Sequence, residues 1–315
     1  MNIVILDYKT LGDDLDLSGA EKFGKVIKYA TSTQDEAKER VREADVIIVN
    51  KVKMTEDVVE NAPNLKLICE TATGYDNIDI AYCARRGIRV ANTPAYSSAC
   101  VSQVTVSMAL SLITHLNEYR NFVHNGSYQK SVSANMLEPI YHEVECLTWG
   151  IIGFGNIGRK VAAVASALGC KILVNKRHPV SDFECVDLDT ILEKSDIISI
   201  HCPLSNETRG MIGKEQLEMM KKSAIIINVA RGAIWDEEAV ANAILDGTIG
   251  GMACDVFSKE PLPKEHPFNK ILDKENVILT PHMAWGSYES RTRCFNTVLS
   301  NIEAYLDGRE QNFVK

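Results

Sequence analysis

The chain of 315 residues lacks several features that assign a protein to a class at once. It has no apolar run long enough to span a bilayer, and residues 2–7 at its start are typical of a first strand rather than a signal peptide. Its nine cysteines include no C-x-x-C pair, so we expect most of them to be small core residues of a reduced, intracellular protein. We therefore predict a cytoplasmic protein that contacts no membrane, and we predict no metal site.

Positive charge is also scarce in this sequence. The 34 Lys and Arg residues are outnumbered by 42 Asp and Glu, which gives a net charge of −8. A general nucleic-acid surface needs clustered positive charge, so we expect no nucleic-acid partner. The chain has no low-complexity segment and no short-period repeat. Its length is too great for one small core and suggests two domains.

What the sequence does contain is a regular alternation of apolar runs and helical patterns. Strand-like runs and amphipathic segments alternate in the first hundred residues, and the alternation resumes after Arg177. Such alternation predicts an α/β protein with parallel, helix-covered sheets. In the first half the expected strands are 2–7, 25–29, 46–50, 67–69 and 89–91, and the expected helices lie near 34–43, 55–61 and 78–86.

One predicted helix, 97–126, is too long and too apolar for an ordinary surface helix. Its apolar positions at helical spacing are Val101, Val104, Met108, Leu112 and Leu116. The helix either links the two domains or packs against a partner subunit, or it does both. We predict a homodimer, because this stripe needs burial that one subunit does not supply.

Three glycines mark a candidate dinucleotide site. Gly153, Gly155 and Gly158 follow an apolar strand at G-x-G-x-x-G spacing and open a helical pattern, and a second apolar run comes after it. In such a unit the first glycine makes the turn and the second admits a pyrophosphate. The third allows close packing of the helix, whose N-terminus attracts the anion. Glycines also occur in ordinary turns, but the strand–helix–strand context favours a dinucleotide.

The residues after the second strand of this unit bear on which dinucleotide is bound. An NAD site places a carboxylate there, about 20 residues past the first glycine, to hold the ribose 2′-hydroxyl. This chain has Asn175, followed by Lys176 and Arg177. A carboxylate would repel a 2′-phosphate, whereas an amide beside two cations attracts it. The two cations could instead belong to a solvated turn. We predict NADP as the cofactor, with NAD as the alternative.

Candidate acid–base residues follow the later strands. In an open parallel sheet, ligands bind just past the carboxyl ends of the strands. Arg231 lies where an apolar strand ends, and its guanidinium suits the carboxylate and carbonyl of a 2-keto acid. His282 follows the last strand and can donate or accept a proton near neutral pH. A Glu260 carboxylate beside it would favour the imidazolium and fix the ring.

The loop 71–77 in the first half is a candidate anion site. It follows a predicted strand and precedes a predicted helix, so its backbone N–H groups could bind a carboxylate. The alternative is an ordinary strand-to-helix turn with Asn77 as the N-cap.

Taken together and in this order, the motifs resemble those of the D-isomer-specific 2-hydroxyacid dehydrogenases. The matching segments are Gly153–Gly158, Val229-Ala230-Arg231-Gly232, Asp255-Val256-Phe257 with Glu260-Pro261-Leu262, and Thr280-Pro281-His282. The resemblance covers essentially the whole chain. It implies two Rossmann-like, doubly wound parallel-sheet domains of the α/β class. A substrate domain of residues 1–98 and 287–315 would then contain an inserted dinucleotide-binding domain, residues 99–286.

The resemblance also implies roles for individual residues. The implied catalytic residues are Arg231, Glu260 and His282. Cofactor contacts are implied at Asn156, Ile157, Cys202, Pro203, Thr208, Ala230 and Asp255, and substrate contacts at Thr73 and Gly74. Within the family, the start of the chain and the segment after His282 look most like glycerate dehydrogenases, also called hydroxypyruvate reductases. Trp285 would form a bulky wall suited to a small substrate.

Two classes of function are consistent with these residues. The first is an oxidoreductase that moves a hydride between NADP(H) and a small 2-keto acid such as hydroxypyruvate or glyoxylate, or an NAD-dependent relative that acts on another 2-hydroxy acid. The second is a non-catalytic protein that senses dinucleotides. The complete set of Arg231, Glu260 and His282 favours the enzyme, because a sensor has no need of a proton donor.

Overall fold

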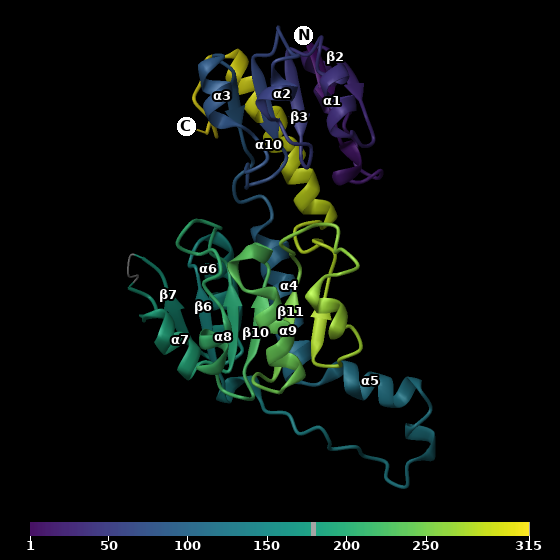
Figure 1. Cartoon of the computed structure of the whole chain (residues 1–315), viewed down its shortest axis with the longest axis vertical. Helices are drawn as coiled ribbons and strands as arrows, with labels where there is room; N and C mark the ends of the chain where they lie inside the picture. The colour runs from purple at the N-terminus through teal and green to yellow at the C-terminus, as the bar shows by residue number, and fades with distance from the viewer. Residues whose placement is uncertain (178–180, 315) are drawn as a thin grey trace. The chain divides into compact units, whose positions relative to one another are not determined.

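The computed structural model of the chain describes residues 1–177 and 181–314. The chain divides into two compact units, of which unit 1 comprises Met1–Ser97 and Gly286–Lys315, and unit 2 comprises Ser98–Trp285. Unit 2 is therefore inserted in the sequence of unit 1. Each unit is built on one parallel sheet flanked by helices (Figure 1). The predicted α/β class with two parallel sheets is confirmed.

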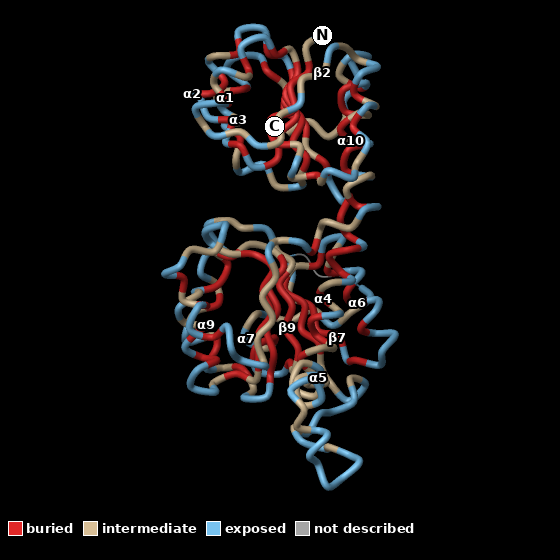
Figure 2. Tube along the Cα trace, turned by 90° about the vertical axis from the view of Figure 1, so that its right-hand side faces the viewer, coloured by how far each residue is buried: buried red, intermediate tan, exposed pale blue. Residues whose placement is uncertain are grey.

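Unit 1 contains a five-stranded sheet in the order β2-β1-β3-β4-β5. The helices α1, α2 and α3 cover one face and contribute to a single buried apolar cluster, and α10 covers the other face (Figure 2). The strands are β1 (Asn2–Ile5), β2 (Lys25–Lys28), β3 (Val46–Val49), β4 (Leu67–Glu70) and β5 (Arg89–Ala91). The helices are α1 (Gln34–Arg40), α2 (Glu56–Val59), α3 (Ile80–Arg85) and α10 (Tyr288–Leu306), with short 3-10 helices η1 (Tyr8–Thr10) and η2 (Ser18–Phe23).

Unit 2 contains a seven-stranded sheet in the order β12-β11-β10-β9-β6-β7-β8. Its strands are β6 (Thr148–Ile152), β7 (Lys171–Asn175), β8 (Glu184–Cys185), β9 (Ile197–Ile200), β10 (Ile225–Asn228), β11 (Gly251–Cys254) and β12 (Val277–Leu279). Its helices are α4 (Ser98–Ile113), α5 (Leu116–His124), α6 (Asn156–Ala167), α7 (Leu188–Lys194), α8 (Lys214–Glu218) and α9 (Glu237–Leu245). The 3-10 helices are η3 (Tyr128–Lys130), η4 (Val144–Cys146), η5 (Gly232–Ile234) and η6 (Pro267–Lys270).

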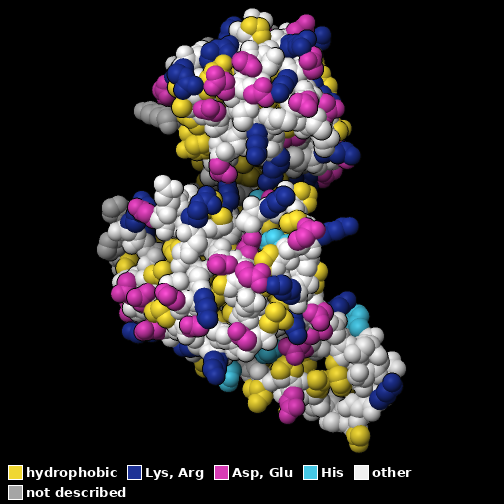
Figure 3. Space-filling model, viewed as in Figure 1, with side chains coloured by type: hydrophobic (Ala, Val, Ile, Leu, Met, Phe, Trp, Pro, Cys, Tyr) yellow, Lys and Arg dark blue, Asp and Glu magenta, His cyan; other side chains and the backbone are white. Residues whose placement is uncertain are grey.

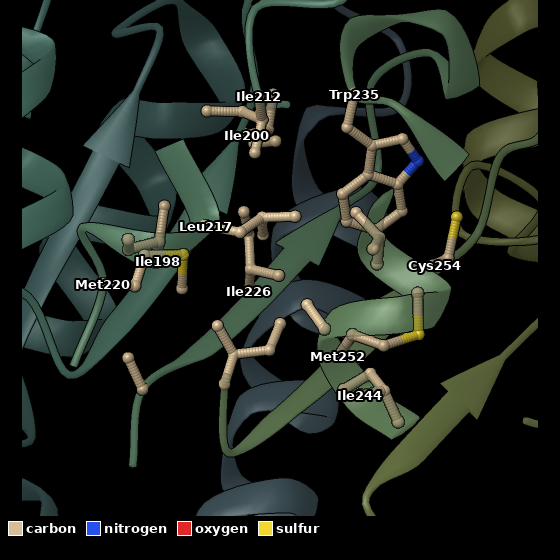
Figure 4. Close-up of a cluster of buried hydrophobic side chains, with 14 of the residues drawn as sticks. Ile198, Ile200, Ile212, Leu217, Met220, Ile226, Trp235, Ile244, Met252 and Cys254 are labelled. Atoms are coloured by element: carbon tan, nitrogen blue, oxygen red, sulfur yellow. The ribbon is translucent and has the colours of Figure 1, made fainter. Parts of the chain in front are cut away.

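The sheet of unit 2 is buried on both faces, because apolar side chains alternate between two clusters along its central strands. Ile198 and Ile226 point toward the layer of α7, α8 and α9, where they meet Leu217 and Ile244 (Figure 4). Ile197 points to the opposite side, into the cluster shared with α4 and α6. Continuous apolar strands of this kind are typical of a parallel sheet covered by helices on both sides.

The strand order places a ligand crevice in this sheet. β6 pairs with β7 on one side and with β9 on the other, so the direction of winding reverses between β6 and β9. In open parallel sheets ligands bind at such a reversal, outside the carboxyl ends of the strands. The glycine loop follows β6 and the Cys202 loop follows β9, so both lie at this edge.

The helix predicted over residues 97–126 is wrong as a single element. The structure has two helices, α4 and α5, bent by 65° at a break where His115 adopts φ +51°. The reason given for a dimer is also wrong for most of the stripe, because Val101, Met108 and Leu112 are buried against α6 and the sheet of their own unit. Only Leu116, 57% exposed, lies clearly on the surface.

The same two helices bear on membrane insertion. Among the helices of residues 1–177 and 181–314, none has by itself the length and apolar composition needed to cross a bilayer, although α4 and α5 meet those two criteria as a bent pair.

Several predicted boundaries also differ from the structure. α2 and α3 are shorter than the helices expected near 55–61 and 78–86. The N-cap of α3 is Asp79, whose side chain accepts the N–H of Tyr82 at 2.8 Å. Asn77 does not cap this helix, because its amide donates to the carbonyl oxygens of Asn50 and Val52.

Candidate active site

The glycine loop after β6 has the geometry of a phosphate-binding turn. Gly153 adopts φ +91°, and a Cβ there would lie 2.4 Å from the backbone nitrogen of Cys202 on the neighbouring strand end. A Cβ at Gly158 would lie 2.3 Å from the carbonyl oxygen of Gly153, so α6 packs closely on the turn. At Gly155, by contrast, a Cβ would have no heavy atom of the described residues within 4 Å. The backbone is therefore open to a ligand at this position.

The start of α6 strengthens this interpretation. The helix runs for 12 residues from Asn156, and its N-cap is Gly155, which offers no side-chain acceptor to the first turn. The N–H groups at Asn156 and Ile157 belong to that turn. They and the helix dipole together favour a bound anion.

The end of β7 carries the residues considered for cofactor selection. The amide of Asn175 donates to the carbonyl oxygen of Val186 at 3.0 Å, which ties the strand end to the segment after β8. Lys176 and Arg177 are exposed, and the Arg177 guanidinium pairs with the carboxylate of Glu207. A 2′-phosphate at this position would compete with Glu207 for Arg177.

The loop after β9 is shaped by its own side chains. Thr208 accepts the N–H of Ser205 at 2.8 Å and donates to the carbonyl oxygen of Pro203 at 2.7 Å. Burial raises the pKa of the Cys202 thiol to about 11, so it stays protonated at neutral pH. Burial also lowers the pKa of His201 to about 3, which keeps this imidazole neutral. His201 is therefore unsuited to proton donation although it lies at a strand end.

The turn after β10 presents Arg231. Asn228, which is buried, accepts the N–H of Ala230 at 3.0 Å and donates to the carbonyl oxygen of Arg231 at 2.9 Å. The Arg231 side chain is half-buried, and its Nη1 lies 2.8 Å from the carbonyl oxygen of Ala230. A Cβ at Gly232 would lie 2.1 Å from the carbonyl carbon of Phe257, so this turn meets the loop after β11.

His282 and Glu260 form an ion-pair geometry at the same edge of the sheet. Nδ1 of His282 lies 2.7 Å from Oε2 and 2.9 Å from Oε1 of Glu260. Because a carboxylate only accepts hydrogen bonds, Nδ1 is the donor and Nε2 is directed away from Glu260. The two side chains are 26% and 28% exposed. Unlike His201, this histidine is partly accessible and has a carboxylate partner.

Asp255, at the end of β11, supports the loop that carries His282. Its Oδ1 accepts the Thr280 hydroxyl at 2.5 Å and the N–H of Met283 at 2.9 Å, and its Oδ2 accepts the N–H of Ala284 at 2.9 Å. Asp255 was assigned from the family pattern to the cofactor. In the structure its carboxylate binds the loop that begins at Thr280, in which His282 adopts φ +53°.

Within unit 1, the loop after β4 is pinned to the segment after β5. The Thr73 hydroxyl donates to the carbonyl oxygen of Thr93 at 2.9 Å, and the Asn92 amide donates to the carbonyl oxygen of Thr73 at 2.7 Å. The N–H of Thr93 donates to the carbonyl oxygen of Ala72 at 3.0 Å. Thr73 and Gly74 therefore lie on an ordered loop at the carboxyl edge of their sheet.

Comparison with known proteins identifies the family. Residues 106–284 match the model of the D-isomer specific 2-hydroxyacid dehydrogenase NAD binding domain. The chain belongs to this family of oxidoreductases. This confirms the resemblance noted from the sequence motifs.

Individual family members cover the chain from end to end. The hydroxypyruvate reductase of Blautia hydrogenotrophica is 34% identical, with 100% of this chain and 99% of that protein covered. The glycerate dehydrogenase of Methylorubrum extorquens is 40% identical over 91% of this chain and 90% of that protein. The D-lactate dehydrogenase of Aquifex aeolicus, solved with NAD and lactic acid, superposes with a TM-score of 0.84 at 30% identity, covering 100% of this chain and 99% of that one.

In this 2-hydroxyacid dehydrogenase the structure places the three implied catalytic residues at one edge of the sheet of unit 2. Thr73 and Gly74 belong to unit 1. Arg231, Glu260 and His282 lie on the turns after the neighbouring strands β10, β11 and β12. Trp285 packs partly against the cluster beneath α4. The supporting role of Asn228 was missed. A polar residue that closes the apolar run Ile225–Asn228 was the available signal, because a buried amide must be hydrogen-bonded.

Proposed function

We propose that the protein is a reductase of small 2-keto acids, such as hydroxypyruvate or glyoxylate, which it interconverts with the corresponding D-2-hydroxy acids. The observation that carries the proposal is the 2.7 Å contact of His282 Nδ1 with Glu260, beside the Arg231 turn. The names of the hydroxypyruvate reductase and glycerate dehydrogenase relatives support the choice of substrate class.

The glycine loop fits a dinucleotide, since its backbone is open at Gly155 and the first turn of α6 faces it. A bound nicotinamide dinucleotide would supply the hydride, with its two electrons, to the keto carbon. The N–H groups at Asn156 and Ile157 would hold the pyrophosphate. The loops at Cys202, Pro203, Thr208, Ala230 and Asp255 would line the rest of the dinucleotide site.

The side chains of the protein then bind the substrate and transfer the proton. The Arg231 guanidinium binds the keto acid and polarises its carbonyl oxygen. The alkoxide that develops takes a proton from Nε2 of His282, which becomes neutral. Glu260 holds the imidazole through Nδ1 and favours its charged form before transfer. Trp285 limits the size of the substrate side chain.

A spectrophotometric survey tests this assignment. NADPH and NADH are each offered with hydroxypyruvate, glyoxylate, pyruvate and bulkier 2-keto acids. We expect oxidation of the reduced cofactor with the two smallest polar substrates at the highest kcat/KM. Binding of a dinucleotide without turnover of any keto acid would contradict the enzyme and favour a sensing protein. The exposed Glu260–His282 pair favours the enzyme, because a sensor requires no proton donor.

For the cofactor we propose NADP(H), selected by Asn175, Lys176 and Arg177. Asn175→Asp should repel the 2′-phosphate and lower kcat/KM for NADPH by roughly tenfold or more, because like charges in contact are strongly unfavourable. The kcat/KM for NADH should rise or stay constant. Steady-state kinetics with both cofactors measures the ratio of the two kcat/KM values. A wild-type enzyme that uses NADH better than NADPH would reject this proposal.

We also propose a homodimer, but now because of side chains on α5 and the segment after it rather than the stripe on α4. α5 and the segment after it project from the sheet of unit 2 and expose apolar side chains that one subunit leaves in solvent (Figures 1 and 3). These are Leu116, Val123, Tyr128, Val132, Leu137, Ile140 and Tyr141. Exposed apolar side chains gathered on one projecting segment are typical of an interface, and a second copy is the partner we expect. Light scattering at micromolar concentration should give the mass of two chains. A monomer there would reject the dimer.

A cytoplasmic location is proposed on the basis of the cysteines. Six of the nine are buried as small apolar side chains, as expected for a protein kept under reducing conditions. Cell fractionation with activity measured in each fraction tests this proposal.

A further inference from the structure

A second glutamate lies behind the Glu260–His282 pair. Glu237 is the first residue of α9, and its side chain is only 10% exposed. Its Oε1 accepts the N–H of Ser258 at 2.8 Å, and its Oε2 accepts the Ser258 hydroxyl. Ser258 precedes Glu260 by two residues on the loop after β11. Glu237 therefore binds the segment that presents Glu260.

His266 lies close to this glutamate on its other side. Nδ1 of His266 accepts the N–H of Phe268 at 3.2 Å, so Nε2 bears the ring proton. Nε2 lies 3.0 Å from Oε2 of Glu237, but the two atoms do not have the geometry of a hydrogen bond. The ring is buried and packs edge-on against Phe257 and Phe268, with centroid distances of 5.8 and 4.9 Å.

The contacts continue from this attachment to the proposed proton donor. The N–H of Phe257 donates to Oε1 of Glu260 at 3.1 Å, and Glu260 in turn meets His282 at 2.7 Å. Residues 258–261 are exposed, so apolar packing does little to fix them. The two hydrogen bonds from Ser258 to Glu237 attach this exposed segment two residues before Glu260.

Capping of α9 does not explain why the Glu237 carboxylate turns to Ser258. The N-terminus of α9 is capped by Asp236, whose side chain accepts the N–H groups of Glu238 and Ala239. The adjacent Glu238 is paired with Lys270 on the surface. Of the three consecutive acids, only Glu237 turns its carboxylate to Ser258 and His266. The other acid at this strand end, Asp255, is occupied by the loop of His282.

We propose that Glu237 is a positioning residue that fixes the 258–261 segment so that Glu260 reaches Nδ1 of His282. The inference rests on the proposed roles of Glu260 and His282 and adds a residue that acts through Ser258. Loss of Glu237 then lets the Glu260 carboxylate move away from the imidazole. The imidazolium loses its partner, and the pH profile of keto-acid reduction moves to the acid side.

The test compares Glu237→Ala with Glu238→Gln, a matched control at the neighbouring exposed acid. Glu237→Ala should lower kcat for keto-acid reduction by no more than the roughly tenfold expected for Glu260→Gln, because Glu237 acts only through Glu260. Its pH profile should shift to the acid side, as it does in Glu260→Gln. Dissociation constants for NADPH, measured by fluorescence titration, should remain at the wild-type value. Glu238→Gln should leave all three measurements unchanged.

A double-mutant cycle decides whether Glu237 acts through Glu260. In a Glu260→Gln background, Glu237→Ala should lower kcat by no more than about twofold, because the pair it positions is already lost. A double variant whose kcat falls by the product of the two single-variant effects would overturn the proposal. If the alanine variant is unfolded by circular dichroism, Glu237→Gln takes its place in the same cycle. A Glu260→Gln enzyme with wild-type turnover and pH profile would instead reject the proposed function, and the positioning role with it.

Discussion

The carboxyl edges of the two parallel sheets carry acidic side chains in opposite environments. In unit 1, Asp7 after β1 and Glu70 at the end of β4 are buried. In unit 2, Glu260 after β11 is partly exposed and faces His282. The same topological position therefore holds acids that organise backbone in one sheet and an acid that faces a titratable ring in the other.

The buried acids of unit 1 bind loops rather than ligands. Asp7 accepts the N–H groups of Asn50, Lys51 and Val52 at 3.0, 2.6 and 3.2 Å, which fixes the turn after β3. Glu70 accepts the Asn77 amide at 3.0 Å. Burial raises the pKa of both carboxyls, that of Glu70 strongly. Glu70 therefore has a structural role, through its hydrogen bond to Asn77 in the loop after β4.

The two histidines at strand ends in unit 2 show the same contrast. Burial lowers the pKa of His201 to about 3 and leaves it bonded to the Ser199 hydroxyl at 3.0 Å. His282 is partly exposed and has a carboxylate partner. Position at a strand end is therefore not sufficient for acid–base chemistry. Access to solvent and an ionised partner are also required.

The largest effect on kcat is expected from substitution of His282, and a much smaller one from substitution of His201. His282→Ala should lower turnover of the best keto acid by roughly 10²–10⁴-fold, the usual cost of a missing general acid, with cofactor affinity nearly unchanged. His201→Gln should change kcat less than tenfold, because a buried neutral ring has no proton to deliver. Steady-state kinetics and cofactor titration measure both. Near-wild-type turnover of His282→Ala would contradict the proposed proton donor and favour a protein that senses dinucleotides.

A smaller effect is expected from the carboxylate that faces His282. Glu260→Gln keeps the size of the side chain but removes the charge that favours the imidazolium. The reductive pH profile should therefore shift to the acid side, with kcat near neutral pH reduced by about tenfold. Rates of keto-acid reduction across pH 5 to 9 measure the shift. An unchanged profile would mean that Glu260 only orients the ring.

The smallest effect concerns the buried acid of unit 1. The pKa of Glu70 is raised in the folded protein, so the folded state keeps this proton to higher pH than the unfolded state does. Stability is therefore lost as pH rises from the ordinary Glu range through the raised value. Charged groups near Glu70 are Asp7, Lys51 and Asp76, and they stay in place in Glu70→Gln.

Glu70→Gln removes this titration. Its melting temperature should match that of the wild type near pH 4 and exceed it by about 2–4 °C at pH 8, the change expected for roughly 1 kcal/mol. Thermal unfolding followed by circular dichroism at several pH values measures the difference. A constant offset at all pH values would show that Glu70 does not titrate with folding.

Much of the architecture was predictable because its signals are local. Apolar strands alternating with helical patterns indicated two parallel sheets, and the spacing of Gly153, Gly155 and Gly158 indicated the turn into α6. Family motifs placed Arg231, Glu260 and His282 at strand ends. Each of these inferences depends on periodicity or on a few consecutive residues, which a sequence displays directly.

The errors arose where distant segments meet. The pattern of Val101, Met108 and Leu112 indicated an apolar stripe, but only the packing of α4 on α6 showed that its own unit buries it. The break at His115 has no strong signal in the sequence, since its φ of +51° is not marked by a glycine or proline.

The sequence by itself determined the two parallel sheets, the glycine turn and the family to which the chain belongs. Only the tertiary structure decided which of its many acids have which role. Glu70 is buried and its pKa is raised, Glu237 accepts two hydrogen bonds from Ser258, and Glu260 is partly exposed beside His282. The reason is physical, because burial and hydrogen-bond partners come from residues far away in the chain. Those surroundings, and not the side chain alone, set whether a carboxylate supports backbone or controls a proton.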